Sequence, residues 1–236
     1  MMNKTVLISG VSGSIGSFLA KYFLANGFYV IGISRRAFVP NVHIDLYRHF
    51  SVDITDELAV IGLFKKLRSE KNQINSFIHC VGVSSALPVT IVSKQSITQT
   101  SDVNATASMI LLREVLKLMV LQRSGSVVNI SSITASTHNH GSAVYSSSKV
   151  AFEHFCKVAA IENARYGITL NTLRLPVIDQ TEMQQKLSDE VEKKLIESTI
   201  LKRKIELPEI ATICQWLISE DAKVITGEII TPGGIW

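Results

Sequence analysis

The stretch Thr5-Val-Leu-Ile-Ser-Gly-Val-Ser-Gly-Ser-Ile-Gly16 decides the fold. Its apolar beginning, up to Ser9, is typical of a short buried strand. The three glycines that follow let the backbone turn tightly and approach a ligand closely. Apolar residues then recur at helical spacing from Phe18 onward, and a helix N-terminus favours an anionic group such as a pyrophosphate. The stretch therefore predicts a strand, a phosphate-binding loop and a helix, or more simply a tight turn that packs the helix against the strand.

Outward from this stretch, strand patterns alternate with helix patterns along the whole chain. Further strands are expected at 28–33, 48–52, 76–81, 127–130, 168–174 and 226–231, with a turn at Gly125-Ser126 before the fourth of these. Helices are expected at 58–67, 97–121, 144–166 and 208–217. This alternation predicts an α/β protein whose parallel sheet is covered on both faces. We expect one domain over residues 1–236, with a charged substrate loop or lid at about 177–206.

Composition limits the classes of function. The 236 residues are 46% hydrophobic, and the net charge of +4 is spread along the chain, which disfavours nucleic acid as a partner. Three widely separated cysteines show no metal-binding spacing, so we expect no metal and a reducing, cytoplasmic setting. No apolar run approaches the ~20 residues of a membrane helix, and we expect no membrane partner.

The second predicted strand ends in Ser34-Arg35-Arg36. In a dinucleotide-binding fold, this strand end meets the adenosine ribose, where an acidic residue would favour NAD. A guanidinium instead pairs well with a phosphate, so these residues predict NADP(H) as the cofactor. A solvated basic turn is the alternative.

A second motif lies in Asn129-Ile-Ser-Ser132 and Tyr145-Ser-Ser-Ser-Lys149. Four residues apart on a helix, Tyr145 and Lys149 lie on one face, and Ser132 follows a strand. The reference pKa of tyrosine is about 10, and a nearby cation lowers it, so we expect the pKa of Tyr145 to lie well below that value. A surface tyrosine and lysine on an amphipathic helix is the alternative. Asn104, inside the pattern 97–121, either faces solvent or opens the helix locally.

Together these residues resemble the short-chain dehydrogenase/reductase family, closest to its 3-oxoacyl-[acyl-carrier-protein] reductase-like members, from Val6 to Gly234. The resemblance implies a Rossmann-like fold and an active site of Asn104, Ser132, Tyr145 and Lys149. It also implies cofactor contacts from Gly10, Ser12, Gly13, Ser14, Ile15, Gly16, Ser34, Arg35, Arg36, Asp53, Ile54, Cys80, Val81, Gly82, Tyr145, Lys149, Pro176, Val177 and Thr181.

Three departures from the family pattern stand out. Ser14 takes the place of the middle glycine of the first motif, His79-Cys-Val-Gly82 replaces Asn-Asn-Ala-Gly, and Val177 replaces a glycine. Gly-x-x-Gly-x-x-Gly is the spacing of the longer sugar-nucleotide epimerase branch, but the short C-terminal part leaves no room for that branch's substrate domain.

The resemblance implies hydride transfer from NADPH to a ketone or 3-oxoacyl thioester, with Tyr145 as proton donor and Ser132 bonded to the substrate oxygen. It further implies that Lys149 tunes Tyr145 and holds the nicotinamide ribose, and that Asn104 positions water. Two alternatives remain open: a sugar-modifying dehydrogenase or epimerase of polysaccharide biosynthesis, and a non-catalytic NADP(H)-sensing protein.

The expected partners are a small carbonyl or alcohol substrate, free or bound to an acyl carrier protein, and further copies of the chain. The predicted helices 104–121 and 144–166 carry apolar residues on more than one face. We therefore expect a homotetramer, or failing that a homodimer.

Overall fold

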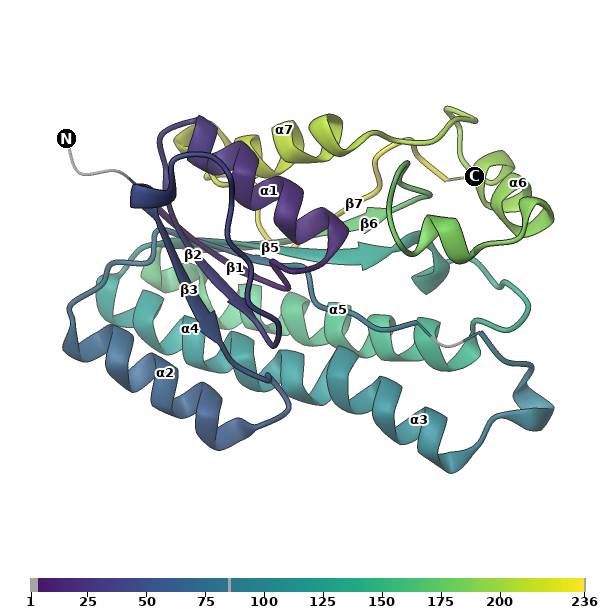
Figure 1. Ribbon diagram of the computed structural model, residues 1–236, viewed down its shortest axis with the longest axis horizontal. Coiled ribbons are helices and arrows are strands. Elements are labelled where there is room, and N and C mark those ends of the chain that lie inside the picture. The colour runs from purple at the N-terminus through teal and green to yellow at the C-terminus, as the bar shows by residue number, and fades with distance from the viewer. Residues whose placement is uncertain (1–3, 85, 236) are drawn as a thin grey trace.

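The computed structural model describes residues 4–84 and 86–235. Within this part of the chain, seven parallel strands form one sheet in the order β3-β2-β1-β4-β5-β6-β7 (Figure 1). The strands are β1 Thr5–Ser9, β2 Tyr29–Ser34, β3 Tyr47–Ser51, β4 Ser76–His79, β5 Gly125–Ser132, β6 Ile168–Leu175 and β7 Ile229–Ile230. The prediction of a doubly wound parallel sheet is confirmed.

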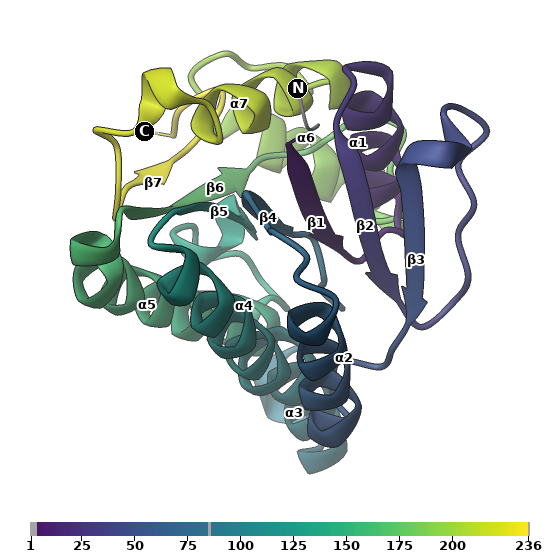
Figure 2. The same ribbon diagram turned by 90° about the vertical axis from the view of Figure 1, so that its left-hand side faces the viewer.

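Helices cover both faces of the sheet (Figure 2). One face carries α2 Glu57–Ser69, α3 Lys94–Ser101, α4 Ser108–Gln122 and α5 Ala143–Asn163, and the other carries α1 Ser14–Ala25 and α7 Leu207–Leu217. The short helix α6 Asp189–Glu197 belongs to the predicted substrate loop. Single 3₁₀ turns lie at Ile44–Leu46, Val89–Ile91, Ile133–Ala135, Ala164–Tyr166, Gln184–Lys186 and Glu220–Ala222.

Two apolar cores, one on each face, explain why β1 is apolar at successive positions from Val6 to Ile8. In β1, Leu7 belongs to the core under α2, α4 and α5, whereas Val6 and Ile8 belong to the core under α1 and α7. Successive side chains of a strand point to opposite faces, so a strand covered on both sides needs apolar residues at every position.

The predicted turn at Gly125-Ser126 is wrong, since both residues lie within β5 and pair with Ile168 and Thr169 of β6. A Cβ atom at Gly125 would overlap the side chain of Met119 in α4. The glycine therefore reflects close packing of helix against strand.

The predicted helix 97–121 is interrupted. After α3, residues Asp102–Ala107 form a π-helical turn, and the regular helix resumes as α4. The predicted last strand, 226–231, is reduced to Ile229–Ile230, where two residues pair with β6.

Candidate active site

The glycine loop between β1 and α1 is shaped by close backbone contacts. Gly10 has φ +76°, and its N–H donates to the carbonyl of Ile33 at 2.7 Å. A Cβ at Gly16 would overlap the Gly10 carbonyl oxygen, so the first turn of α1 lies directly against the loop. Helix α1 begins after Gly13 with no side-chain cap from the described residues. Its first N–H groups therefore remain suited to an anionic ligand.

The neighbouring strand ends bring the predicted ribose-side residues together. The Ser34 hydroxyl donates to the Arg36 carbonyl at 2.7 Å and so holds the turn after β2. An Arg35 guanidinium nitrogen lies 3.9 Å from the carboxylate of Asp53, which follows β3. Asp53 accepts from the N–H and hydroxyl of Thr55 at 3.0 and 2.8 Å, and these bonds, the backbone one foremost, lower its pKa. Arg35 is largely exposed and free to meet a further anionic group.

Ser132 and Tyr145 are in contact. Ser132 ends β5, Tyr145 lies in the first turn of α5, and their hydroxyls are hydrogen-bonded. The Thr134 hydroxyl donates to Ser132 at 3.0 Å. Ser132 accepts this hydrogen bond, so the proton of its own hydroxyl remains available for donation to an oxygen at the site.

Lys149 lies one turn further along the buried face of α5. Its ammonium nitrogen is 5.8 Å from the centre of the Tyr145 ring and 3.4 Å from the carbonyl oxygens of Val81 and Ile130. The predicted spacing on one helix face therefore describes a buried pair, and the alternative of two surface residues is wrong.

The pKa values of this pair differ from expectation. Burial raises the pKa of Tyr145 to about 12, although the hydrogen bond from Ser132 lowers it in part. Burial also lowers the pKa of Lys149 to about 8. The prediction that the lysine brings the tyrosine pKa well below 10 is wrong, because the loss of solvation on burial outweighs the hydrogen bond from Ser132 that lowers the pKa.

Asn104 sits in the π-helical turn and is almost fully buried. Its side-chain amide donates to the Val83 carbonyl at 2.8 Å and to the Ser148 hydroxyl at 3.0 Å, while its oxygen accepts from the Val83 N–H at 2.8 Å. Of the two predicted alternatives, the structure thus shows the local opening of the helix, a feature that is frequent at functional sites.

The remaining predicted residues line the same edge of the sheet. A Cβ at Gly82 would lie 2.9 Å from the Lys149 nitrogen and 3.7 Å from the Asn104 oxygen, so this glycine stands between them. In the loop after β6, the backbone N–H of Glu182 donates to the Ser14 hydroxyl at 3.1 Å, which joins the 177–206 region to the glycine loop. The neighbouring Thr181 is buried, and its hydroxyl donates to the Ile178 carbonyl.

Sequence reasoning missed the residues that support the site. Ser148 connects Asn104 to α5, since it accepts from the Asn104 amide and donates to the Tyr145 carbonyl at 2.7 Å. Thr134 holds Ser132, and Val83 holds Asn104. A hydroxyl three residues after Tyr145, on the same helix face, was the one signal available for Ser148.

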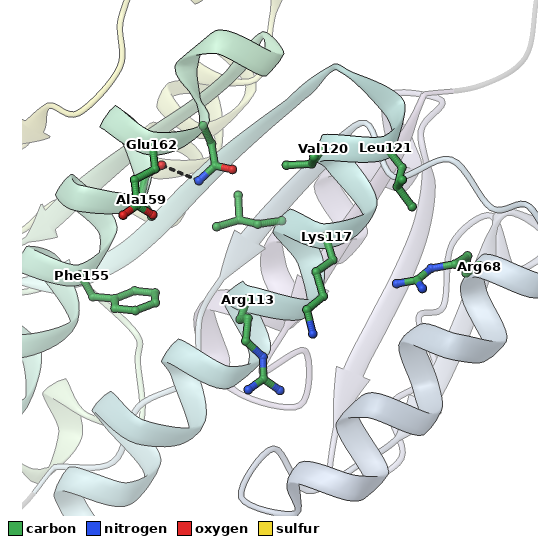
Figure 3. A pocket seen from close by; sticks show the side chains of 10 residues that line it. Arg68, Arg113, Lys117, Val120, Leu121, Phe155, Ala159 and Glu162 are labelled. Atoms are coloured by element: carbon green, nitrogen blue, oxygen red, sulfur yellow. Dashed lines mark hydrogen bonds between the residues drawn. The ribbon is translucent and has the colours of Figure 1, made fainter.

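Elsewhere, a groove of about 470 Å³ lies between α2, α4 and α5, away from this edge of the sheet (Figure 3). Its lining residues are Arg68, Arg113, Leu116, Lys117, Val120, Leu121, Phe155, Ala159, Glu162 and Asn163. In the described ranges, no three His, Cys, Asp or Glu side chains are grouped as metal ligands would be. Among the described residues, no helix is long and apolar enough to cross a membrane.

Comparisons with known proteins agree with this geometry. Residues 10–234 match the family model described as Enoyl-(Acyl carrier protein) reductase. The 3-oxoacyl-[acyl-carrier-protein] reductase FabG of Rickettsia bellii is 29% identical over 99% of this chain and 97% of its own length. The FabG of Escherichia coli strain K12 is 25% identical over 98% and 96%.

Two solved structures of similar fold carry different nicotinamide cofactors. ElxO with NADP bound superposes with a TM-score of 0.88 at 26% identity, covering 98% of this chain and 97% of that one. A 4-hydroxyisoleucine dehydrogenase complexed with NADH superposes with a TM-score of 0.87 at 29% identity, covering 98% of each chain.

Proposed function

Since the chain belongs to the short-chain dehydrogenase/reductase family and is an NAD(P)-dependent oxidoreductase, we propose that it reduces a ketone or a 3-oxoacyl thioester with NADPH. The observation that carries this proposal is the cluster of the half-buried Ser132 with the buried Tyr145 and Lys149 at the carboxyl edge of the sheet. This cluster lies at the same edge as the glycine loop, where ligands bind in open parallel sheets.

The residues at this edge fit a dinucleotide. The glycine loop and the uncapped start of α1 suit the pyrophosphate, and the glycines at positions 10 and 16 leave no room for side chains. Gly82, beside Lys149 and Asn104, leaves the nicotinamide side open. When bound, the cofactor supplies the hydride, and the protein supplies orientation and electrostatics.

The chain's own groups then handle the proton. With a pKa of about 12, Tyr145 holds its proton at neutral pH and gives it to the substrate oxygen as negative charge develops there. Ser132 donates a hydrogen bond to the same oxygen, an interaction that is strongest in the transition state. Lys149 remains mostly protonated below pH 8 and places a positive charge beside the phenol.

The choice between NADPH and NADH rests on Arg35 and Arg36. Both lie exposed after the end of β2, and the carboxylate of Asp53 is 3.9 Å from the Arg35 guanidinium. A charge-assisted bond to a phosphate is worth about 1.5–3 kcal/mol, or roughly tenfold to a hundredfold in affinity. These residues support NADPH as the preferred cofactor.

The cofactor proposal is tested by titrating both dinucleotides into the parent protein and Arg35→Ala. We expect Arg35→Ala to bind NADPH roughly tenfold to a hundredfold more weakly and to bind NADH as before. Lys21→Ala, which removes an exposed cation from α1, serves as the control and should change neither affinity. Equal affinities of the parent protein for the two cofactors would refute the proposal.

The substrate proposal is tested by following NADPH oxidation by absorbance against acetoacetyl thioesters and a panel of ketones. We expect turnover of at least one thioester or ketone. Tight NADPH binding without any turnover would favour the NADP(H)-sensing alternative, and activity on sugar nucleotides alone would favour the sugar-modifying one.

We propose that two copies pair through the groove beside α4 and α5, where Leu121 is 69% exposed, and that β7 makes a second two-fold contact in a homotetramer. The three thiols are unpaired, which supports a reducing compartment such as the cytoplasm.

A further inference from the structure

A fully buried histidine adjoins the site but takes no part in the proposed chemistry. His79 is the last residue of β4, is 1% exposed, and pairs with Ser9 of β1 and Asn129 of β5 in the centre of the sheet. It stands where the family pattern has an asparagine. Its ring packs edge-on against Phe152 of α5, with 5.1 Å between the ring centroids.

Both ring nitrogens of His79 are hydrogen-bonded. Nδ1 lies 2.8 Å from the Ser9 hydroxyl, and Nε2 lies 2.9 Å from the Ser108 hydroxyl at the start of α4. The Ser108 hydroxyl donates its single proton to the Val103 carbonyl at 2.9 Å. Ser108 must therefore accept from His79, so the ring carries its proton on Nε2 and accepts from Ser9 at Nδ1.

This arrangement reaches the π-helical turn. Val103 lies inside that turn and directly precedes Asn104, whose amide is bonded to Val83 and Ser148. A continuous series of hydrogen bonds thus runs from Ser9 in the sheet, through His79 and Ser108, to the backbone that carries Asn104.

The imidazole is held neutral by its surroundings. Burial, and then the charge of Lys149, lowers the pKa of His79 to about 3. A neutral ring keeps one donor and one acceptor, which is the combination that Ser108 and Ser9 require.

We propose that His79 is a positioning residue: as the Nε2–H form, it fixes Ser108 and thereby the π-helical turn that places Asn104 at the active site. The proposal rests on the proposed function for its kinetic consequences. The tautomer of His79 and the rigidity of Asn104 can both be measured without any substrate.

The first test compares the two ends of the hydrogen-bonded series. Ser108→Ala removes the bond toward the π-helical turn, whereas Ser9→Ala, the matched control, removes a buried serine bond on the far side of the ring. We expect Ser108→Ala to lower kcat about tenfold, as displacement of a group at an active site does, with KM and the Kd for NADPH within about twofold. Ser9→Ala should keep kcat within about twofold. Equal loss in both variants, or loss in neither, would overturn the proposal.

The second test uses amide hydrogen exchange and needs no activity. The Val83 N–H donates to the Asn104 oxygen, so its exchange rate reports whether Asn104 is held. We expect faster exchange at Val83 in Ser108→Ala and an unchanged rate in Ser9→Ala. An unchanged rate in Ser108→Ala would contradict the proposed role.

The third test concerns the ring itself. Nitrogen-15 NMR of the parent protein should show His79 protonated on Nε2, and a proton on Nδ1 would overturn the proposal. In His79→Gln, the amide reaches the position of Nε2 and can still donate to Ser108, whereas in His79→Asn it reaches only the position of Nδ1. We expect His79→Gln to restore more of kcat than His79→Asn, and full activity of His79→Asn would contradict the proposal. If the parent protein turns over no substrate, the proposed function fails, while the exchange and NMR results still decide this inference.

Discussion

Burial acts on the two ionisable residues of the candidate site in opposite directions. It raises the pKa of Tyr145 to about 12 and lowers the pKa of Lys149 to about 8, so each group is pushed toward its neutral form. The phenol consequently keeps its proton near neutral pH, while the lysine still carries most of its charge. The site therefore combines a proton donor with a poorly solvated cation.

Replacing Tyr145 by Phe separates proton donation from packing. The ring still fills the buried site, but the donated proton is lost, and turnover should fall by about 10²–10⁴, the usual contribution of general acid catalysis. The Kd for NADPH, measured by fluorescence titration, should stay within about threefold. Near-parental turnover on a good substrate would show that Tyr145 is not the acid.

Replacing Lys149 by Met should lower activity but stabilise the fold at pH 7. The pKa of Lys149 falls from 10.5 to about 8 on folding, so the charged form costs about 3 kcal/mol in the native state. Between these two values the unfolded chain holds the proton that the native state has lost, so the stability of the parent protein rises with pH there.

The measurement is urea unfolding of parent and Lys149→Met at pH 7 and pH 10. At pH 7 we expect the free energy of unfolding of the variant to exceed that of the parent protein by up to about 3 kcal/mol. At pH 10 this difference between the two proteins should be smaller. A variant less stable than the parent protein at pH 7 would contradict the account of Lys149 as an unfavourably buried charge.

Among the elements, the glycine loop leaves the least room for side chains. A Cβ at Gly16 would overlap the Gly10 carbonyl, and backbone atoms there have little freedom to move, whereas at Gly13 the same oxygen would be 3.4 Å away. Gly16→Ala should therefore lower the free energy of unfolding by about 1–3 kcal/mol, as overpacking does, and weaken cofactor binding. Gly13→Ala, with φ −90°, should cost less than about 1 kcal/mol. If thermal unfolding shows equal losses of stability in Gly16→Ala and Gly13→Ala, the close contact at Gly16 does not determine the loss.

The sequence predicts the regular elements well because their signals are local. The apolar runs of β1, β2 and β4 and the long pattern of α5 lie within a few residues of their expected bounds. Gly125 was misassigned because its role depends on Met119, a contact between a helix and a strand. The π-helical turn at Asp102–Ala107 was foreseen only as one of two alternatives, since the bonds that hold it involve His79 and Ser148, which are distant in sequence.

The site itself was predictable where the residue spacing carried the information. Ser132, Tyr145 and Lys149 lie together as their intervals implied, and Asn104 joins them through Ser148. The pKa of Tyr145 was not predictable, because the direction of its shift depends on burial and not on the neighbouring charge alone.

For the whole molecule, the groove beside α4 and α5 makes a prediction about assembly. Leu121 lines this groove and is 69% exposed, so Leu121→Asp places a charge in the proposed contact between two copies. Light scattering should give a tetramer, or at least a dimer, for the parent protein and a smaller species for the variant. Val39→Asp, at a position 67% exposed in the loop after β2 and outside the groove, is the control and should leave the mass unchanged. A monomeric parent protein at micromolar concentration would refute the proposal.

The strand order has a consequence for how the chain acquires its structure during synthesis. The first strand of the sheet in chain order, β1, lies between β2 and β4, so Val6 pairs on its second edge only after Ser76 has been synthesised. The other end of the sheet closes only when Ile229 of β7, the last strand in chain order, pairs with Thr172 of β6. Parallel pairings between distant segments form slowly and leave apolar strands exposed meanwhile. The nascent protein therefore leaves apolar strand edges uncovered until β7 has been synthesised.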